Sequence, residues 1–470
     1  MDQPRHYFFC GIGGSGMLPL AMILVAQGHR VEGSDRALDQ GRTLSKFDYL
    51  RANGITLHRQ DGSGLTSGSQ ILVASAAVEE AVPDVAAALA NGSPRITRAE
   101  LLASLFNDAS CSIAIGGTSG KSTTTGMVGW ILHHAGHSPT VVNGAVMKNF
   151  VSSDAPFASA VLGEGEAFVS EVDESDGSIA LFSAEIAVLN NISHDHKTME
   201  ELRELFADFV SKADIAILNR DDEEVVALAK KTRILNSICY GIENEVADLI
   251  ASDIKATQQG VEFSVLDYPE NERVQVKLAM PGRHNVSNAL AAIAAAQAAG
   301  VSLDQSAAAL NEFAGIKRRT EVVGTAGDIT IIDDFGHNPD KIAATLSALH
   351  AFPGRLLVMF QPHGFGPLRL MRKGFVVCFD NHMAAQDVLL MPDPVYFGGT
   401  TNREVTSKHI ASDLGSRGKQ AIACDTREEC GAKLLELAQP GDRIIIMGAR
   451  DDTLSDFAAE ILAKLKDQVR

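Results

Sequence analysis

The sequence predicts an α/β protein of three domains, and three observations support this prediction. Short apolar runs alternate with helical stretches along most of the 470 residues, which is typical of parallel sheets covered by helices. Two of these runs end in glycine-rich turns, at residues 11–16 and 116–120. A chain of this length is too long for one hydrophobic core. We therefore expect domains at residues 1–108, 109–316 and 317–470, the first and third of them Rossmann-like.

The bulk composition narrows the class of protein. A formal net charge of -18 argues against nucleic acid or an anionic membrane as a partner. No apolar run is long enough to span a membrane, and the first residues show no signal-peptide pattern. The six cysteines are scattered without a CxxC pair, which favours free thiols in a reducing compartment. We expect a cytoplasmic protein.

The first domain begins with a nucleotide-binding pattern. A buried strand is predicted over residues 6–10, followed by a GxGxxG turn and a helix over 17–27. A second strand ends in Asp35, placed to accept a hydrogen bond from a ribose or base, and Ser75 follows a strand at 70–74. The alternative is a tight turn that binds nothing. The predicted ligands of a dinucleotide or nucleotide sugar are Gly13, Gly14, Ser15, Gly16, Asp35 and Ser75.

A second glycine-rich turn opens the central domain. It follows the apolar run 111–115 and leads into a helical stretch at 126–134, so its backbone N–H groups and the helix dipole suit a phosphate. Strict P-loop spacing requires glycine at position 115, where this chain has Ile115. The alternative is a structural turn with an incidental lysine. We predict that a shortened P-loop binds ATP through Gly117, Thr118, Ser119, Gly120, Lys121, Ser122 and Thr123.

A carboxylate-rich run follows the next buried strand. Four acids stand within residues 171–176, and a solvated acidic loop is the simplest explanation. A metal-dependent ATP site, however, needs one or two carboxylate ligands beside the P-loop hydroxyl. Glu171 lies nearest the strand, so we predict that Glu171 and Ser122 hold Mg²⁺.

Histidines follow the strand at 185–189. His194 and His196 flank an aspartate, and they form either a capped turn or a ligand for a second metal ion, with His196 the candidate. Zinc is disfavoured because no cysteine or third histidine has suitable spacing. The strand at 214–218 repeats the pattern of a strand followed by a polar turn.

The pattern changes between residues 237 and 277, where short alternating runs predict added antiparallel strands. A polar stretch at 282–288 then precedes an alanine-rich helix predicted over 289–299. In the simplest interpretation these polar residues only cap the helix. Alternatively, adenine is recognised by His284, Asn285 and Asn288.

The third domain shows strands at 329–333, 355–360, 387–391, 420–424 and 443–447 and a helix at 454–466. Its first residues are basic, at 317–319. Ligands of parallel sheets lie at the carboxyl ends of the strands. We therefore expect the residues after two of these strands to face a cleft, including Asp334, His337, Asn338 and His363.

In their order and spacing, these motifs resemble the Mur ligase family of ATP-dependent amide-bond ligases. The resemblance covers essentially the whole chain. It implies a first domain that holds a UDP-sugar, a central ATPase domain and a third domain that closes over the nucleotide. The pattern is most similar to members that join L-alanine to UDP-N-acetylmuramate in peptidoglycan precursor synthesis, acting as a monomer or weak dimer. The alternative within the family is a recycling ligase that adds a cell-wall tripeptide.

The resemblance also implies roles for single residues. Lys121, Glu171 and His196 are expected to be catalytic, with two Mg²⁺ ions held by Ser122, Glu171 and His196. His284 and Asn288 would contact adenine, Asp334 the ATP ribose and Arg319 the phosphates. The incoming amino acid would meet His337, Asn338, His363 and Arg369.

The sequence departs from the family pattern in one place. Alanine-adding members usually carry arginines at the positions of Gly364 and Pro367, whereas this chain has Arg369 and Arg372 further on. This departure concerns the identity of the incoming amino acid and not the class of reaction.

Two other classes of protein fit the sequence less well. A dinucleotide-dependent oxidoreductase would leave the P-loop and Glu171 unexplained. A non-catalytic nucleotide sensor is disfavoured by the intact Lys121 and Ser122.

Overall fold

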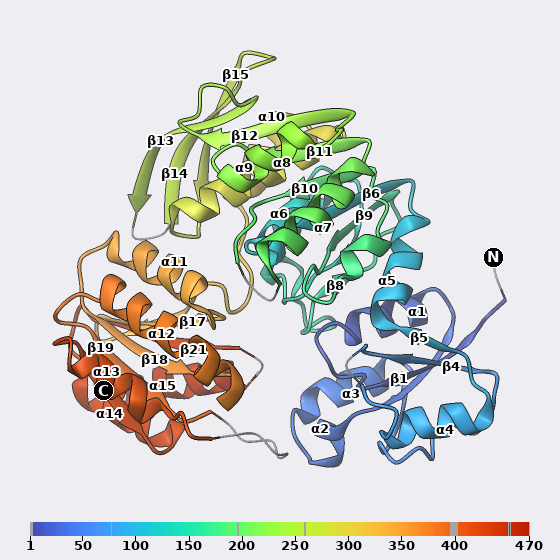
Figure 1. Cartoon of the computed structure of the whole chain (residues 1–470), viewed down its shortest axis with the longest axis horizontal. Helices are drawn as coiled ribbons and strands as arrows, with labels where there is room; N and C mark the ends of the chain where they lie inside the picture. Colours follow the sequence, from blue (N-terminus) through green and yellow to red (C-terminus); the bar gives the residue numbers. More distant parts are fainter. Residues whose placement is uncertain are drawn as a thin grey trace. The chain divides into compact units, whose positions relative to one another are not determined.

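The computed structural model describes residues 3–76, 78–194, 197–257, 260–394, 403–449, 451 and 453–469. The chain divides into two compact units (Figure 1). The first unit comprises residues 1–253, 263–276 and 287–314, and the second comprises 254–262, 277–286 and 315–470. No helix among the described residues has both the length and the apolar character needed to cross a membrane.

The first unit begins with a five-stranded sheet in the order β3-β2-β1-β4-β5, parallel throughout. The chain moves outward from β1 on one side and then returns to the other side, so the order reverses between β1 and β4. Ligands of open α/β sheets bind at such a point. The elements are β1 (His6–Cys10), α1 (Leu18–Ala26), β2 (Arg30–Ser34), α2 (Arg36–Asp39), α3 (Leu44–Ala52), β3 (Thr56–His58), β4 (Gln70–Ala74), α4 (Pro83–Asn91), β5 (Arg95–Thr97) and α5 (Arg98–Asn107).

A second sheet has ten strands in the order β15-β14-β13-β12-β11-β10-β6-β9-β7-β8. The strand β6 lies between β9 and β10 and is parallel to both. The strands of this second sheet are β6 (Cys111–Gly116), β7 (Thr140–Val142), β8 (Ala160–Val161), β9 (Ala167–Glu171), β10 (Ile186–Leu189), β11 (Ile215–Asn219), β12 (Asn236–Ile242), β13 (Leu249–Thr257), β14 (Gly260–Asp267) and β15 (Glu272–Leu278). The helices are α6 (Lys121–His134), η1 (Lys148–Phe150), η2 (Ser178–Leu181), α7 (Met199–Ser211), α8 (Glu223–Lys231), α9 (Arg283–Ala298) and α10 (Leu303–Asn311).

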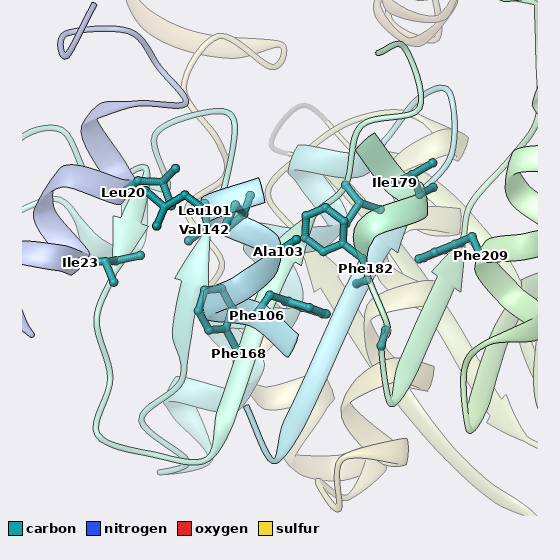
Figure 2. Close-up of a cluster of buried hydrophobic side chains, with 14 of the residues drawn as sticks. Leu20, Ile23, Leu101, Ala103, Phe106, Val142, Phe168, Ile179, Phe182 and Phe209 are labelled. Atoms are coloured by element: carbon teal, nitrogen blue, oxygen red, sulfur yellow. The ribbon is translucent and has the colours of Figure 1, made fainter. Parts of the chain in front are cut away.

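One apolar core joins these two sheets within the first unit (Figure 2). Phe106 of α5 is fully buried. Its ring meets that of Phe168 on β9 edge-on, with centroids 5.6 Å apart, and that of Phe182 at 5.3 Å. Leu20 of α1 and Val142 of β7 belong to the same core. Because α5 packs into both halves, the glycine-rich turn after β1 and the P-loop after β6 are held in one rigid framework.

The second unit contains a six-stranded sheet in the order β16-β17-β21-β18-β19-β20, in which only the β16–β17 pair is antiparallel. Neighbouring residues of β17 and β18 enter different cores. Ile332 and Val358 pack in one core, whereas Ile331 and Leu357 pack in the other. Its elements are β16 (Glu321–Ala326), β17 (Ile329–Asp334), α11 (Pro339–His350), β18 (Leu356–Gln361), α12 (Phe365–His382), β19 (Val388–Pro392), α13 (Ser407–Gly415), β20 (Gln420–Cys424), α14 (Arg427–Leu437), β21 (Arg443–Gly448) and α15 (Thr453–Val469).

The predicted α/β class is confirmed, together with the strands that precede each glycine-rich turn. The added strands are also present, but they are not all antiparallel, because β12 is parallel to both β11 and β13. The short links between β13, β14 and β15 make these three strands antiparallel neighbours. The predicted start of one helix, α9, was wrong. The polar stretch at 282–288 was expected to precede its helix, but α9 already begins at Arg283. Gly282, with φ of 103°, ends the preceding segment, so His284 and Asn285 lie in the first helical turn.

The aromatic core provides a test of stability. Phe106→Ala removes a fully buried ring, and we expect a loss of about 3–5 kcal/mol in the free energy of unfolding. Leu44→Ala, at a site that is 51% exposed on α3, should change it by no more than about 0.5 kcal/mol. Urea unfolding followed by circular dichroism measures both. Equal shifts in the two variants would contradict the proposed joint core.

Candidate active site

The P-loop connects β6 to α6. Gly117 and Gly120 have φ angles of 126° and 82°, in the left-handed region that favours glycine. Gly120 caps the helix, and a Cβ atom there would lie 2.4 Å from Oδ1 of Asn288. The loop therefore requires glycine at both positions. It turns the chain so that α6 begins at Lys121, earlier than the helical stretch predicted from sequence.

Two asparagines after β10 hold this loop and the start of α6 in place through hydrogen bonds. The backbone N–H and the hydroxyl of Ser119 donate to Oδ1 of Asn191 at 2.9 and 3.2 Å, and Nδ2 of Asn191 donates to the Ser119 carbonyl at 3.1 Å. Nδ2 of Asn190 donates to the hydroxyl of Thr124 at 3.0 Å. The loop is thus fixed before any phosphate binds, which lowers the entropy lost on binding.

Lys121 forms an ion pair with Glu174 that is largely withdrawn from solvent. Its side chain is 18% exposed and that of Glu174 only 4%. Burial alone would lower the pKa of the Lys121 ammonium, but Glu174, Asp173 and Glu171 together raise the pKa above its usual value. Burial likewise acts to raise the pKa of Asp173, and chiefly Lys121 brings that pKa below its ordinary value. Lys121 therefore remains a cation in this setting.

Ser122 and Glu171 form the pair of oxygen donors predicted for Mg²⁺. The register of β6 and β9 pairs Ile115 with Glu171, and the Ser122 hydroxyl donates to Oε2 of Glu171 at 2.7 Å. The described residues contain no group of three or more histidine, cysteine, aspartate or glutamate side chains that could hold a metal. A hydroxyl and a carboxylate nevertheless fit Mg²⁺, which keeps several waters and takes phosphate oxygens as ligands.

The segment after β7 supports this pair. Asn143 donates from Nδ2 to the Ser122 carbonyl at 2.9 Å. A Cβ atom at Gly144 would lie 2.0 Å from Oε1 of Glu171. The missing side chain at Gly144 is therefore what makes room for the carboxylate.

A cavity of about 110 Å³ extends from these groups to the first sheet. Its lining includes Lys121, Glu171 and Asp173 from the region of the second sheet, and Gly16 and Arg98 from the region of the first. The structure thus places the last glycine of the first turn and the P-loop lysine on a single cavity within the first unit.

The first glycine-rich turn lies at the carboxyl end of β1. Gly11 and Ile12 donate their N–H groups to the carbonyl of Ser34 at 2.8 and 2.9 Å. Asp35, predicted to meet a ribose or base, accepts from the Gly13 N–H and from the Ala37 N–H, both at 2.8 Å. Its carboxylate therefore shapes the turn and caps α2, and contact with a nucleotide stays a prediction. Ser75 follows β4, on the other side of the switch point.

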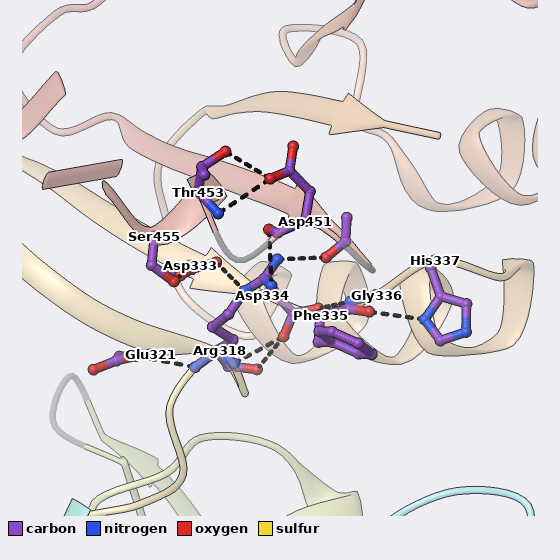
Figure 3. A network of polar contacts seen from close by, with 12 residues as sticks. Arg318, Glu321, Asp333, Asp334, Phe335, Gly336, His337, Asp451, Thr453 and Ser455 are labelled. Atoms are coloured by element: carbon purple, nitrogen blue, oxygen red, sulfur yellow. Dashed lines mark hydrogen bonds and ion pairs between the residues drawn. The ribbon is translucent and has the colours of Figure 1, made fainter. Parts of the chain in front are cut away.

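In the second unit, Asp334 is buried at the end of β17 (Figure 3). Its Oδ2 accepts from the Thr320 N–H at 2.8 Å and from the Thr320 hydroxyl at 3.3 Å. Its Oδ1 accepts from the Gly336 N–H at 2.8 Å and from the Thr345 hydroxyl at 3.1 Å. A ribose would have to share or replace one of these bonds, so the predicted contact stays a prediction.

Arg318 and Arg319 differ in their surroundings. Arg318 is buried, and its guanidinium donates to the carbonyls of Gly448 at 2.6 Å and Asp451 at 3.1 Å (Figure 3). It thereby links the segment before β16 to the end of β21. The Arg319 guanidinium stacks over the Phe335 ring at 4.8 Å. Of the two, Arg319 is the one predicted to bind phosphate.

The residues predicted to face the incoming amine gather after β17 and β18. The rings of His337 and His363 are 5.3 Å apart and perpendicular. Nδ1 of His337 donates to the Phe335 carbonyl at 2.9 Å. Burial, together with the nearby charge of Lys341, lowers the pKa of His337 to about 3. The ring is therefore neutral at physiological pH, with Nε2 as an acceptor.

Two other predicted residues of this group lie on helices. Asn338 caps α11 by accepting from the Lys341 N–H at 3.0 Å, and Arg369 is exposed on α12. Gly364 precedes α12 and Pro367 lies in its first turn. This is where the chain departs from the family pattern.

The residues predicted to meet adenine are divided between the two units. Asn288 belongs to the first unit, where Oδ1 accepts from the Thr124 hydroxyl at 3.4 Å. Asn285 and His284 belong to the second, and Asn285 donates to the Pro281 carbonyl at 2.7 Å. His196 lies outside the described residues. Contact of Asn288, Asn285 and His284 with adenine stays a prediction.

Sequence reasoning did not single out three residues of the site. Glu174 stood within the acidic run, but four acids so close together cannot be ranked by spacing. Arg98 and Gly144 carry no motif, since the fold alone brings them to Gly16 and Glu171.

Comparison with protein-family models accounts for most of the chain. Residues 6–110 match the Mur ligase family catalytic domain, 115–296 the Mur ligase middle domain, and 318–450 the Mur ligase glutamate ligase domain. The chain belongs to the Mur ligase family.

Curated relatives of this Mur ligase are similar along their full length. It is 35% identical to a UDP-N-acetylmuramate–L-alanine ligase of Cereibacter sphaeroides, over 98% of this chain and 96% of the relative. It is also 35% identical to the enzyme of that name from Geobacter sulfurreducens, over 98% and 97%.

Solved structures show the same fold. The UDP-N-acetylmuramate–alanine ligase of Thermotoga maritima superposes with a TM-score of 0.79 at 24% identity, covering 98% of this chain and 99% of that one. A murein peptide ligase of Psychrobacter arcticus gives 0.72 at 25% identity with the same coverage.

The space at Gly144 yields a prediction. Gly144→Ala should displace the Glu171 carboxylate from Ser122 and lower kcat about 10²-fold, because a misplacement of about 1 Å costs this much. Gly415→Ala is the control, since a Cβ there meets nothing within 4 Å. Steady-state assays of ATP turnover compare them. Unchanged kcat in Gly144→Ala would contradict the position given to Glu171.

Proposed function

We propose that the chain is a UDP-N-acetylmuramate–L-alanine ligase, which joins L-alanine to the lactyl carboxylate of the sugar nucleotide at the expense of ATP. The observation that carries this proposal is 35% identity to ligases of that name over 98% of the chain. The Lys121–Glu174 and Ser122–Glu171 pairs supply the groups that such a reaction needs.

The difficulty of this reaction is electrostatic. The lactyl carboxylate attacks the γ-phosphate of ATP, giving an acyl phosphate and ADP. Because both reactants are anions, the site must neutralise and align them. Lys121, held by Glu174, is the side-chain cation proposed to bind the transferred phosphoryl group. The amine then attacks the acyl carbon, loses a proton, and phosphate leaves.

Ser122 and Glu171 would hold one Mg²⁺, and His196 a second. Bound there, Mg²⁺ would neutralise charge on the β- and γ-phosphates and orient the sugar carboxylate. The hydrogen bond between Ser122 and Glu171 supports this assignment, because it brings the two oxygen atoms within 2.7 Å of each other.

We assign the three segments as follows. Residues 1–108 would hold the UDP part through the turn at 11–16, Asp35 and Ser75. Residues 109–316 would bind ATP, with Asn288 near adenine. Residues 317–470 would close over the nucleotide through Arg319 and Asp334 and receive the amino acid near His337 and His363. We further propose that the chain works in the cytoplasm as a monomer or weak dimer.

One observation favours a second candidate, a ligase that adds a preformed cell-wall peptide to the same sugar nucleotide. Gly364 and Pro367 at the start of α12 replace the arginines that the alanine-adding members usually carry. The solved murein peptide ligase also shares the fold.

Phosphate release from ATP decides between these candidates. With UDP-N-acetylmuramate present, we expect release to require L-alanine. Preference for L-alanyl-γ-D-glutamyl-diaminopimelate would favour the second candidate. Release that does not depend on the sugar nucleotide would overturn both.

Lys121→Ala tests the role of the ammonium. We expect turnover to fall at least about 10³-fold, the scale of a cation that stabilises the transition state of phosphoryl transfer. Binding of UDP-N-acetylmuramate, measured by calorimetry, should change less than about threefold because the glycine-rich turn lies on a different sheet. An equal loss of turnover and of sugar-nucleotide binding would refute the claim that Lys121 acts in the reaction and not in binding the sugar nucleotide.

A further inference from the structure

Arg98 is held in place by the start of α5. The Thr97 hydroxyl accepts from the Glu100 N–H at 3.1 Å, and Oε2 of Glu100 accepts from the Thr97 N–H at 2.7 Å. This capping box fixes the helix start directly after β5. As the first residue of α5, Arg98 has a backbone position that the fold determines tightly.

The side chain of Arg98 lies over Gly16. A Cβ atom at Gly16 would be 2.9 Å from Cδ of Arg98, 3.3 Å from Nη1 and 3.4 Å from Nε. The guanidinium therefore packs directly on the last glycine of the turn after β1. Gly16 leaves the space that the guanidinium occupies.

The guanidinium also faces a cavity. Arg98 lines the same 110 Å³ space as Gly16, Lys121 and Glu171. Within the described part of the chain, the guanidinium forms no hydrogen bond or ion pair, and its charge is one of those that lower the pKa of Asp173. Its donors are thus available to a ligand.

The ligand chemistry follows from charge and shape. The N–H groups of a glycine-rich turn contribute dipoles but no full positive charge. On a chain of net charge -18, a diphosphate needs a local cation. A guanidinium presents a planar fork of donors that matches two phosphate oxygens, and this one lies on the turn itself.

We propose that Arg98 binds the diphosphate of the nucleotide sugar, between the glycine-rich turn and the P-loop. This inference rests on the proposed function for the identity of the sugar nucleotide. Arg98 would neutralise the diphosphate and fix the point from which the sugar reaches toward Lys121. Because Lys121 and Arg98 line one cavity, the diphosphate and the transferred phosphoryl group would each have their own cation.

Calorimetry with UDP and uridine tests this proposal on the full-length chain. Arg98→Ala should weaken UDP binding about 10- to 100-fold, the range for a lost charge-assisted hydrogen bond, and leave uridine binding unchanged. Arg98→Lys should recover part of the loss, since it restores charge but not the fork. Gly16→Ala, which pushes the guanidinium away, should weaken UDP binding in the same selective way.

Arg95→Ala is the matched control, because Arg95 is an exposed arginine on the adjoining strand β5. It should bind UDP as the unaltered protein does. Retained ATP binding in Arg98→Ala shows that the variant is folded. UDP affinity within twofold of the unaltered protein, or an equal loss for uridine, would overturn the proposal. Failure of UDP-N-acetylmuramate to stimulate phosphate release would instead contradict the proposed function and leave the UDP result standing.

Discussion

The site depends on how one buried ammonium is held among carboxylates. Lys121 pairs with Glu174, and Glu171 and Asp173 add to the negative field that keeps it charged. An unpaired buried lysine would tend to lose its proton. A lysine whose donors were all taken up by carboxylates, however, could not also bind a phosphate oxygen. Lysine has three donors, so Lys121 can keep Glu174 and still bind a phosphoryl oxygen. The ion pair thus keeps Lys121 charged, as the proposed reaction between two anions requires.

Parallel sheets explain why the working residues meet at all. The P-loop follows β6, Glu171 ends β9, and Asn190 follows β10, and these three strands are neighbours. Their carboxyl ends therefore meet at one edge. The first sheet repeats the arrangement with β1, β2 and β4, and the core around Phe106 joins the two sheets. Glu171 thus lies at the end of a strand, and Lys121 and Asn190 follow shortly after strands, which suits the alignment that the proposed reaction requires.

The sequence predicted the parts of this arrangement that are local. Strand, glycine turn and helix are contiguous around Lys121 and around Gly13, so their spacing alone indicates phosphate binding. Glu171 could be chosen because it adjoins a buried strand. Glu174 could not, because its pairing with Lys121 depends on the path of the loop after β9. Arg98 and Gly144 could not be identified from the sequence for a similar reason, since each contacts a residue that is distant in sequence: Arg98 contacts Gly16, and Gly144 lies against Glu171. Asp35 and Asp334 show the converse: both were predicted as ligand contacts, and both already accept several hydrogen bonds from their own surroundings.

Central to the proposed function is the activation of the lactyl carboxylate as an acyl phosphate beside Lys121. Transfer of isotope measures this directly. UDP-N-acetylmuramate labelled with ¹⁸O in its lactyl carboxylate is turned over with ATP and L-alanine, and the released phosphate is analysed by mass spectrometry. If the reaction passes through an acyl phosphate, each phosphate formed from fully labelled substrate will carry one ¹⁸O atom, because the bridging oxygen of the acyl phosphate leaves with phosphorus. Phosphate free of ¹⁸O, with amide product still formed, would contradict it.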